Sequence, residues 1–213
     1  MDSTPTFSRF DDAYKTQTAP WVIGEPQPAI VDLERSGLIH SKVLDVGCGT
    51  GEHTILLTRL GYDVLGVDAA PTAVEQARAN AAEKGVDARF EVADAMTLGS
   101  GLQDGPPYDA VIDSALYHIF DDTDRPRYVA SLHAACRPGA LVHLLALSDK
   151  GRGFGPEVSE SVIRAAFGDG WVLEALEETT YRGVVQEPHV EAIGLPVGTV
   201  VDEPAWLARV RRI

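Results

Sequence analysis

Three glycines at alternate positions, Gly47, Gly49 and Gly51, form the pattern in this sequence with the clearest chemical meaning. They follow the apolar run 43–46, which is typical of a buried parallel strand, and precede residues 53–60, whose apolar side chains recur at helical spacing. Glycine is favoured where the backbone takes a positive φ or lies directly against a ligand. The stretch therefore predicts a strand, a glycine turn and a helix that bind a nucleotide-type ligand.

The residues around the glycines narrow the class of ligand. A dinucleotide-binding turn carries Gly-x-Gly-x-x-Gly, but this chain has Glu52 where the third glycine would stand. Asp45, at the entrance of the turn, would repel a pyrophosphate and suits a cationic ligand with an amino group. No Gly-Lys-Ser/Thr is present, which excludes a phosphate-binding loop. A nicotinamide oxidoreductase is therefore the least favoured reading.

Acidic residues end the next two expected strands. Residues 62–68 end in Asp68, at the place where nucleotide-binding α/β folds hold a ribose diol, and a carboxylate can accept from both hydroxyls. Residues 88–95 end in Asp94 and Ala95, which could bind an adenine through the carboxylate and the backbone amide. The alternatives are a helix cap for Asp68 and a turn for Asp94.

A fourth strand is expected over residues 108–114, which are apolar enough for the centre of a parallel sheet. The segment 113–118 after it should then lie at the same sheet edge as the glycine turn, where ligands bind in open α/β sheets. Further along, we expect helices at 29–38, 71–83, 124–135 and 158–167, and strands at 140–148, 171–181 and 204–213. Glycine-rich residues 149–157 predict a mobile loop on the ligand edge, whereas the loop 183–204, which holds His189, has no placement, and a short helix is the alternative for 204–213.

The first 28 residues carry too many large apolar side chains for a disordered tail. Pro20, Pro26 and Pro28 stiffen the segment around Trp21. Such a rigid, aromatic loop is suited to folding over a bound ligand. The alternative is a hydrophobic strap across the back of the sheet.

Composition limits the remaining possibilities. A chain of 213 residues fits one domain, 1–213, with 1–28 as an N-terminal lid and 29–213 as the core. The net charge of −14 disfavours a nucleic-acid partner. Two cysteines give no disulfide framework, no His/Cys cluster has metal-ligand spacing, and no apolar run approaches the length of a membrane span. We therefore expect a cytoplasmic protein with no metal, no membrane partner and no nucleic-acid partner.

From Trp21 to about Ser148 the chain resembles the class I S-adenosylmethionine-dependent methyltransferases, because the glycine turn, the two strand-end acids and the segment after the fourth strand follow one another in that family's order. The segment Pro-Trp-x-x-Gly-x-Pro-Gln-Pro at 20–28 is similar to the thiopurine and tellurite-resistance type and especially to bacterial heterocyclic toxin methyltransferases, which methylate hydroxyquinolones. The resemblance implies a Rossmann-like, doubly wound, mostly parallel seven-stranded sheet with helices on both faces and an antiparallel last strand. It also implies S-adenosyl-L-methionine as cofactor, a small aromatic substrate, a role in detoxification and a monomer or homodimer.

The same resemblance implies a role for individual residues. These are the methionine end for Asp45, Gly47 and Gly49; the ribose for Asp68 with Ala69; the adenine for Asp94 and Ala95; the sulfonium region for Asp113 and Ser114; and closure over the cofactor for Trp21 and Gly24.

His118 and its neighbour Tyr117 are the expected catalytic residues, because they lie just past the fourth strand, near where the methyl group should emerge. The ordinary pKa of histidine suits a general base at neutral pH, and a packing histidine is the alternative. The expected reaction is O-methylation of a hydroxyl such as that of a hydroxyquinolone. A thiol or thiopurine S-methyltransferase and a non-catalytic cofactor-binding regulator remain as alternatives.

Overall fold

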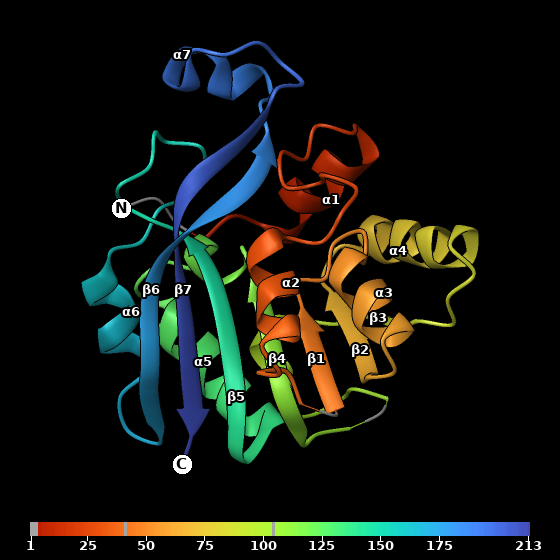
Figure 1. Cartoon of the computed structure of the whole chain (residues 1–213), viewed down its shortest axis with the longest axis vertical. Helices are drawn as coiled ribbons and strands as arrows, with labels where there is room; N and C mark the ends of the chain where they lie inside the picture. Colours follow the sequence, from red (N-terminus) through yellow and green to blue (C-terminus); the bar gives the residue numbers. More distant parts are fainter. Residues whose placement is uncertain (1–3, 41, 104) are drawn as a thin grey trace.

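A seven-stranded sheet organises the computed structural model, which describes residues 4–40, 42–103 and 105–213 (Figure 1). The spatial order of the strands is β3-β2-β1-β4-β5-β7-β6. Their bounds are β1 Lys42–Val46, β2 Asp63–Asp68, β3 Arg89–Val92, β4 Tyr108–Ser114, β5 Cys136–Leu147, β6 Trp171–Val184 and β7 Val200–Arg212. β1 to β5 pair in parallel, and β7 runs antiparallel to both β5 and β6. The expected Rossmann-like sheet with an antiparallel last strand is confirmed.

Helices cover both faces of the sheet (Figure 1). One face packs against α5 (Asp124–Ala135) and α6 (Glu160–Ala166), with the apolar side of each helix in the largest buried cluster. The other face carries α2 (Pro28–Arg35), α3 (Glu52–Arg59) and α4 (Pro71–Glu83). The short elements are α1 Phe7–Lys15, α7 Val190–Ile193, and the single 3₁₀ turns η1 Ala95–Thr97, η2 Tyr117–Ile119 and η3 Glu187–His189. No helix of the described residues is long and apolar enough to cross a membrane.

The order of the strands reverses between the neighbours β1 and β4. From β1 the chain continues through β2 to β3 on one side, and from β4 it continues to β5 on the other side. In open α/β sheets a ligand binds beyond the carboxyl ends of the strands at such a reversal. Figure 1 shows α1 and the η3–α7 segment at this same end of the molecule. Two segments from opposite ends of the sequence therefore close over the ligand edge.

The region expected as an unplaced loop, 183–204, is partly regular. β6 continues to Val184 and β7 begins at Val200, so the two strands form a long antiparallel arm. Beyond the arm, Val185 donates from its amide to the carbonyl of Thr199 (2.9 Å) and accepts from the amide of Gly198 (2.8 Å). We did not predict the ends of this arm, because the glycines and prolines of 183–204 are typical of a loop. Pairing between two strands depends on contacts distant in sequence, which residue type does not reveal.

Candidate active site

A cavity of about 630 Å³ lies at the carboxyl edge of the parallel strands. The N-terminal segment and the β6–β7 arm supply the opposite wall. Residues that end or directly follow the first four strands line it: Gly47, 68–70, 93–95 and 114–116. The expected cofactor residues Gly47, Asp68, Ala69, Asp94, Ala95 and Ser114 are thus brought together on one wall.

The glycine turn needs glycine for two reasons. Gly49 has a φ of 53°, in the left-handed region that side chains disfavour. A Cβ at Gly49 would also lie 2.9 Å from the hydroxyl oxygen of Tyr14. The turn is therefore a bare stretch of backbone, with an aromatic hydroxyl held against it.

Asp68 shapes this turn and also faces the cavity. Its Oδ2 accepts from the amide of Gly49 (3.0 Å) and its Oδ1 accepts from the amide of Ala70 (2.8 Å). Burial raises the pKa of Asp68, and the two backbone amides oppose that rise. Each carboxylate oxygen keeps a second lone pair for a ligand. The arrangement can therefore present a preorganised acceptor pair to a diol.

Asp94 caps η1 by accepting from the amide of Met96 (2.9 Å) through Oδ1. The same residue lines the cavity together with Ala95. The two predictions for Asp94, a turn-forming residue and a ligand contact, are therefore compatible. Oδ1 makes the cap, which leaves Oδ2 for a ligand.

Asp45 and Asp113 correct the expected contact list, because both point away from the cavity. Asp45 is 1% exposed and accepts from the amide (3.1 Å) and the hydroxyl (2.6 Å) of Thr54, at the start of α3. Asp113 is fully buried and accepts from the hydroxyl of Tyr128 (2.7 Å) and from two backbone amides of the following turn. Burial raises the pKa of each to about 6. The Asp45 carboxylate therefore holds the start of α3, and the Asp113 carboxylate holds the turn after β4.

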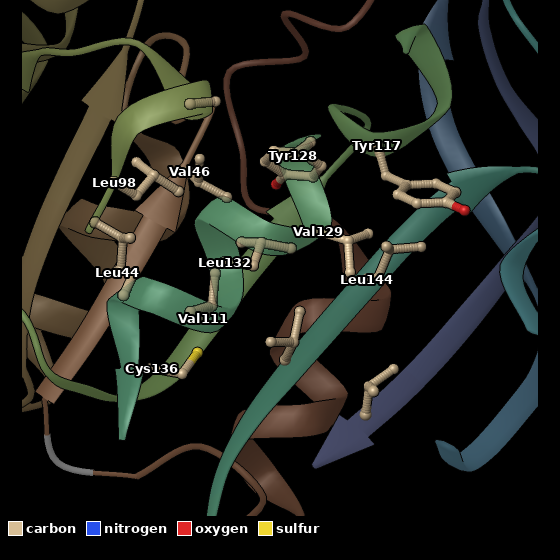
Figure 2. Close-up of a cluster of buried hydrophobic side chains, with 14 of the residues drawn as sticks. Leu44, Val46, Leu98, Val111, Tyr117, Tyr128, Val129, Leu132, Cys136 and Leu144 are labelled. Atoms are coloured by element: carbon tan, nitrogen blue, oxygen red, sulfur yellow. The ribbon is translucent and has the colours of Figure 1, made fainter. Parts of the chain in front are cut away.

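Tyr117, Gly24 and Gly49 are likewise outside the cavity wall. Tyr117 is fully buried, stacks on Phe167 and donates its hydroxyl to the carbonyl of Val162 (3.4 Å). Figure 2 shows its ring within the buried cluster beside α5 and β5. We therefore remove Tyr117 from the catalytic set. Gly24, with a φ of 76°, only turns the chain.

The front of the N-terminal segment acts as a cover over the cavity. Trp21 lines the cavity, and its indole N–H donates to the hydroxyl of Tyr14 (2.8 Å), with the rings edge to face. Tyr14 is 5% exposed and also lines the cavity. The sequence marked Tyr14 only as one of several large side chains, because its meeting with Gly49 depends on tertiary packing.

The rear of the same segment acts as a strap, although not across the back of the sheet. The side-chain amide of Gln27 donates to the carbonyl of Arg182 in β6 (2.8 Å) and accepts from its amide (2.9 Å). The Gln27 backbone amide donates to Nε2 of His53 in α3 (3.1 Å). A lid and a strap were alternative predictions for residues 1–28. In the structure Trp21 covers the cavity, and Gln27 ties the same segment to α3 and β6.

His118 lines the cavity and is 7% exposed. Its Nδ1 accepts a hydrogen bond from the amide of Leu147 (2.9 Å), so the ring proton must be on Nε2. Burial lowers the pKa of His118 to about 4. The ring is therefore neutral at pH 7 and can donate from Nε2. This tautomer disagrees with the expected general base, since Nε2 already carries its proton.

The far wall comes from a part of the chain in which we predicted no site residues. Phe154, Tyr181 and His189 line the cavity there, and the rings of Phe154 and His189 are 4.6 Å apart. Arg152 pairs with the fully buried carboxylate of Glu203 in β7, which fixes the loop that carries Phe154. The expected mobile loop is therefore anchored beside the cavity.

A doubly wound sheet with a bare glycine turn, strand-end acids and a cavity at the strand reversal defines an α/β protein that binds a nucleoside-containing cofactor. Comparison with known proteins specifies the family. A family model described as "Methyltransferase domain" matches residues 43–139. The chain is 36% identical over 162 residues to the 2-heptyl-1-hydroxyquinolin-4(1H)-one methyltransferase of Mycobacteroides abscessus. The matched region covers 73% of this chain and 69% of that enzyme. The chain therefore belongs to the S-adenosylmethionine-dependent methyltransferases.

Solved structures agree with this assignment. A protein solved in work on the "Conversion of a Disulfide Bond into a Thioacetal Group during Echinomycin Biosynthesis" superposes with a TM-score of 0.85 at 38% identity, covering 97% of this chain and 92% of the other. An S-adenosylmethionine-dependent methyltransferase of Anabaena variabilis ATCC 29413 superposes with a TM-score of 0.75 at 16% identity, covering 100% and 98%. The second likeness concerns the fold alone.

Proposed function

We propose that this methyltransferase transfers a methyl group to the hydroxyl oxygen of a small, planar heterocycle of the hydroxyquinolone kind. The observation that carries the proposal is the cavity of about 630 Å³, whose acceptor end is walled by Phe154 and Tyr181 and offers a histidine N–H. Aromatic walls suit a flat apolar ring, and a few placed polar groups orient its reactive atom. The relative in Mycobacteroides abscessus, named for a hydroxyquinolone, supports this substrate class.

The residues on the near wall fit the cofactor. Gly47 lines the cavity and leaves the backbone bare for its methionine end, while the Tyr14 hydroxyl lies against the turn at Gly49. Asp68 would accept from the ribose hydroxyls, and Asp94 with the Ala95 amide would bind the adenine. When bound, S-adenosylmethionine supplies a methyl group activated by the sulfonium. The protein then contributes mainly alignment of the acceptor, worth up to roughly 7 to 11 kcal/mol in intramolecular models.

A panel assay tests the proposal. Purified enzyme with S-adenosylmethionine is offered hydroxyquinolines, N-hydroxyquinolones, simple phenols and aromatic thiols, and products are identified by mass spectrometry. We expect O-methylated hydroxyquinolines or N-hydroxyquinolones to form with the highest kcat/KM. Turnover of thiols alone would favour the second candidate, and binding of the cofactor without turnover of any acceptor would favour a regulatory protein.

A sulfur acceptor is the second candidate, and one observation favours it. The solved structure at 38% identity comes from work on converting a disulfide into a thioacetal, which is chemistry at sulfur. A thiolate would meet the same histidine N–H and aromatic walls as an ionised hydroxyl. The thiol arm of the panel separates the two.

A further inference from the structure

The two histidines on the acceptor side of the cavity, His118 and His189, share one hydrogen-bonding arrangement. In each, Nδ1 accepts a backbone N–H, from Leu147 for His118 (2.9 Å) and from Gln186 for His189 (3.1 Å). Both residues line the cavity. A backbone amide can only donate, so each ring must carry its proton on Nε2.

Neither Nε2 makes a hydrogen bond to another of the described residues. Burial lowers the pKa of both rings, that of His118 to about 4. The His118 ring is therefore neutral at pH 7, the lowered pKa of His189 favours its neutral form as well, and each neutral ring has one N–H to donate. A neutral ring with its proton on the open nitrogen cannot take up the proton of an acceptor there.

We propose that the enzyme selects acceptors that reach the pocket already ionised, as phenolate-like, N-oxide or thiolate anions, and that His118 holds the anionic atom by donating from Nε2 while His189 presents a second donor at the far wall. This rests on the proposed function and narrows its substrate class. The acceptor loses its proton to solvent before binding. Its lone pair then forms the bond to the methyl carbon as the C–S bond breaks, which leaves neutral S-adenosylhomocysteine and no proton to remove in the pocket.

The other ionisable groups around the cavity leave one competitor as a base. Asp68 and Asp94 are held by backbone amides at the cofactor wall. The hydroxyls of Tyr14 and Tyr181 are buried, and burial raises the pKa of both, so they stay protonated. Asp12 and Arg9 belong to α1, which packs on α4 beside the cofactor wall and away from the acceptor end.

The competitor is Glu187, an exposed carboxylate two residues before His189 that also lines the cavity. The variant Glu187→Gln removes its proton affinity and nearly keeps its shape. We expect its kcat/KM to stay within about threefold of wild type for every acceptor. A loss that grows with acceptor pKa in this variant would make Glu187 the base and overturn the proposal.

The main test uses the unmodified enzyme and a series of hydroxyquinolines and phenols whose hydroxyl pKa runs from about 7 to about 10. The pH dependence of kcat/KM is measured for each acceptor. We expect the rate to rise with pH and level off, with a midpoint that follows the pKa of the acceptor across the series. A midpoint that stays at one pH for all acceptors would mark an enzyme base and overturn the proposal. If no acceptor turns over, the proposed function itself fails, which is a different outcome.

Two variants of His118 separate a donor from a base. The amide of His118→Gln can place an N–H near the position of Nε2 but cannot accept a proton, whereas His118→Leu has neither ability. We expect the Gln variant to keep kcat/KM within about tenfold, and the Leu variant to lose about 10- to 100-fold, the range for a hydrogen bond to a charged group. Equal losses in both variants, with melting temperature and S-adenosylhomocysteine affinity unchanged, would contradict donation.

A spectroscopic measurement tests the same point without turnover. The ultraviolet absorbance of a hydroxyquinoline substrate distinguishes its neutral and anionic forms. With S-adenosylhomocysteine present, we expect the bound substrate to ionise at lower pH than in free solution, and His118→Leu to remove at least half of this shift. A bound substrate that ionises at its solution pKa or above would contradict an anion-binding pocket.

Discussion

The two walls of the cavity are built in different ways. The cofactor wall is assembled from consecutive strand ends between residues 43 and 116, and its key contacts are between backbone amides and carboxylates. The acceptor wall gathers side chains from η2, the loop 149–157, β6 and η3, and its contacts are ring packing and one ion pair to a buried carboxylate. The first wall therefore has its geometry set by local turns. The second depends on how distant segments meet.

The two walls are joined by Gln27, whose contacts reach α3 on one side and β6 on the other. Gln27→Ala would leave the part-buried amide and carbonyl of Arg182 without these partners, at about 1 to 3 kcal/mol for each group. We expect the free energy of unfolding to fall by about 2 to 4 kcal/mol in urea titrations. The exposed residue Gln103, changed to alanine, is the control and should stay within about 0.5 kcal/mol. A normal unfolding curve for Gln27→Ala would mean that the walls hold together without the strap.

Asp68 tests the cofactor wall directly. Asp68→Ala removes the proposed acceptor of the ribose hydroxyls and the partner of two turn amides, so S-adenosylmethionine should bind about 1.5 to 3 kcal/mol more weakly. Asp63→Ala is the matched control, because Asp63 lies at the other end of the same strand and pairs with Arg89 at the surface. Calorimetric titration of both variants gives the comparison. Unchanged affinity in Asp68→Ala would remove Asp68 from the site.

One methyl group added to each wall should separate their roles. The new Cβ of Gly49→Ala would meet the Tyr14 hydroxyl at 2.9 Å in a left-handed backbone, so we expect about tenfold weaker cofactor binding. The new Cβ of Gly183→Ala would overlap the ring of Phe154, so we expect a severalfold higher KM for the acceptor and little change in cofactor affinity.

The control for backbone strain is Gly85→Ala, which has a φ of 64° and open space around its Cβ position. It should lower the melting temperature slightly and change neither binding constant. If Gly183→Ala weakened the cofactor as much as the acceptor, the division into two walls would be wrong.

The difference between the walls also explains what the sequence could predict. The glycine turn and the acids Asp68 and Asp94 could be found because a parallel strand ends at a fixed edge, so chain order gives position. The same logic failed for Asp45 and Asp113, because a residue at the right place can still point into the core. Strand and helix identities followed from periodicity, while the ends of β6 and β7 did not.

The acceptor wall could not be predicted, for physical reasons. His189 and Phe154 meet only because the β6–β7 arm and an ion-paired loop bring them together across the cavity. The protonated nitrogen of His118 is set by the backbone amide of Leu147, which lies 29 residues further along the chain. Residue type suggested a base, but the hydrogen-bond partner determines which nitrogen carries the proton.

The smallest expected effect concerns the hydrogen bond between Trp21 and Tyr14, which closes the cover over the glycine turn. Trp21→Phe keeps an aromatic ring but removes the indole N–H, and a neutral hydrogen bond contributes about 0.5 to 1.5 kcal/mol. We expect two- to tenfold weaker cofactor binding, about the same in Tyr14→Phe, and no further loss when the two changes are combined. Trp206→Phe is the control, since it removes a comparable indole bond (3.2 Å) in the core and should lower only the melting temperature. Additive losses in the double variant would show that the two residues contact the ligand independently, rather than as one hydrogen-bonded cover.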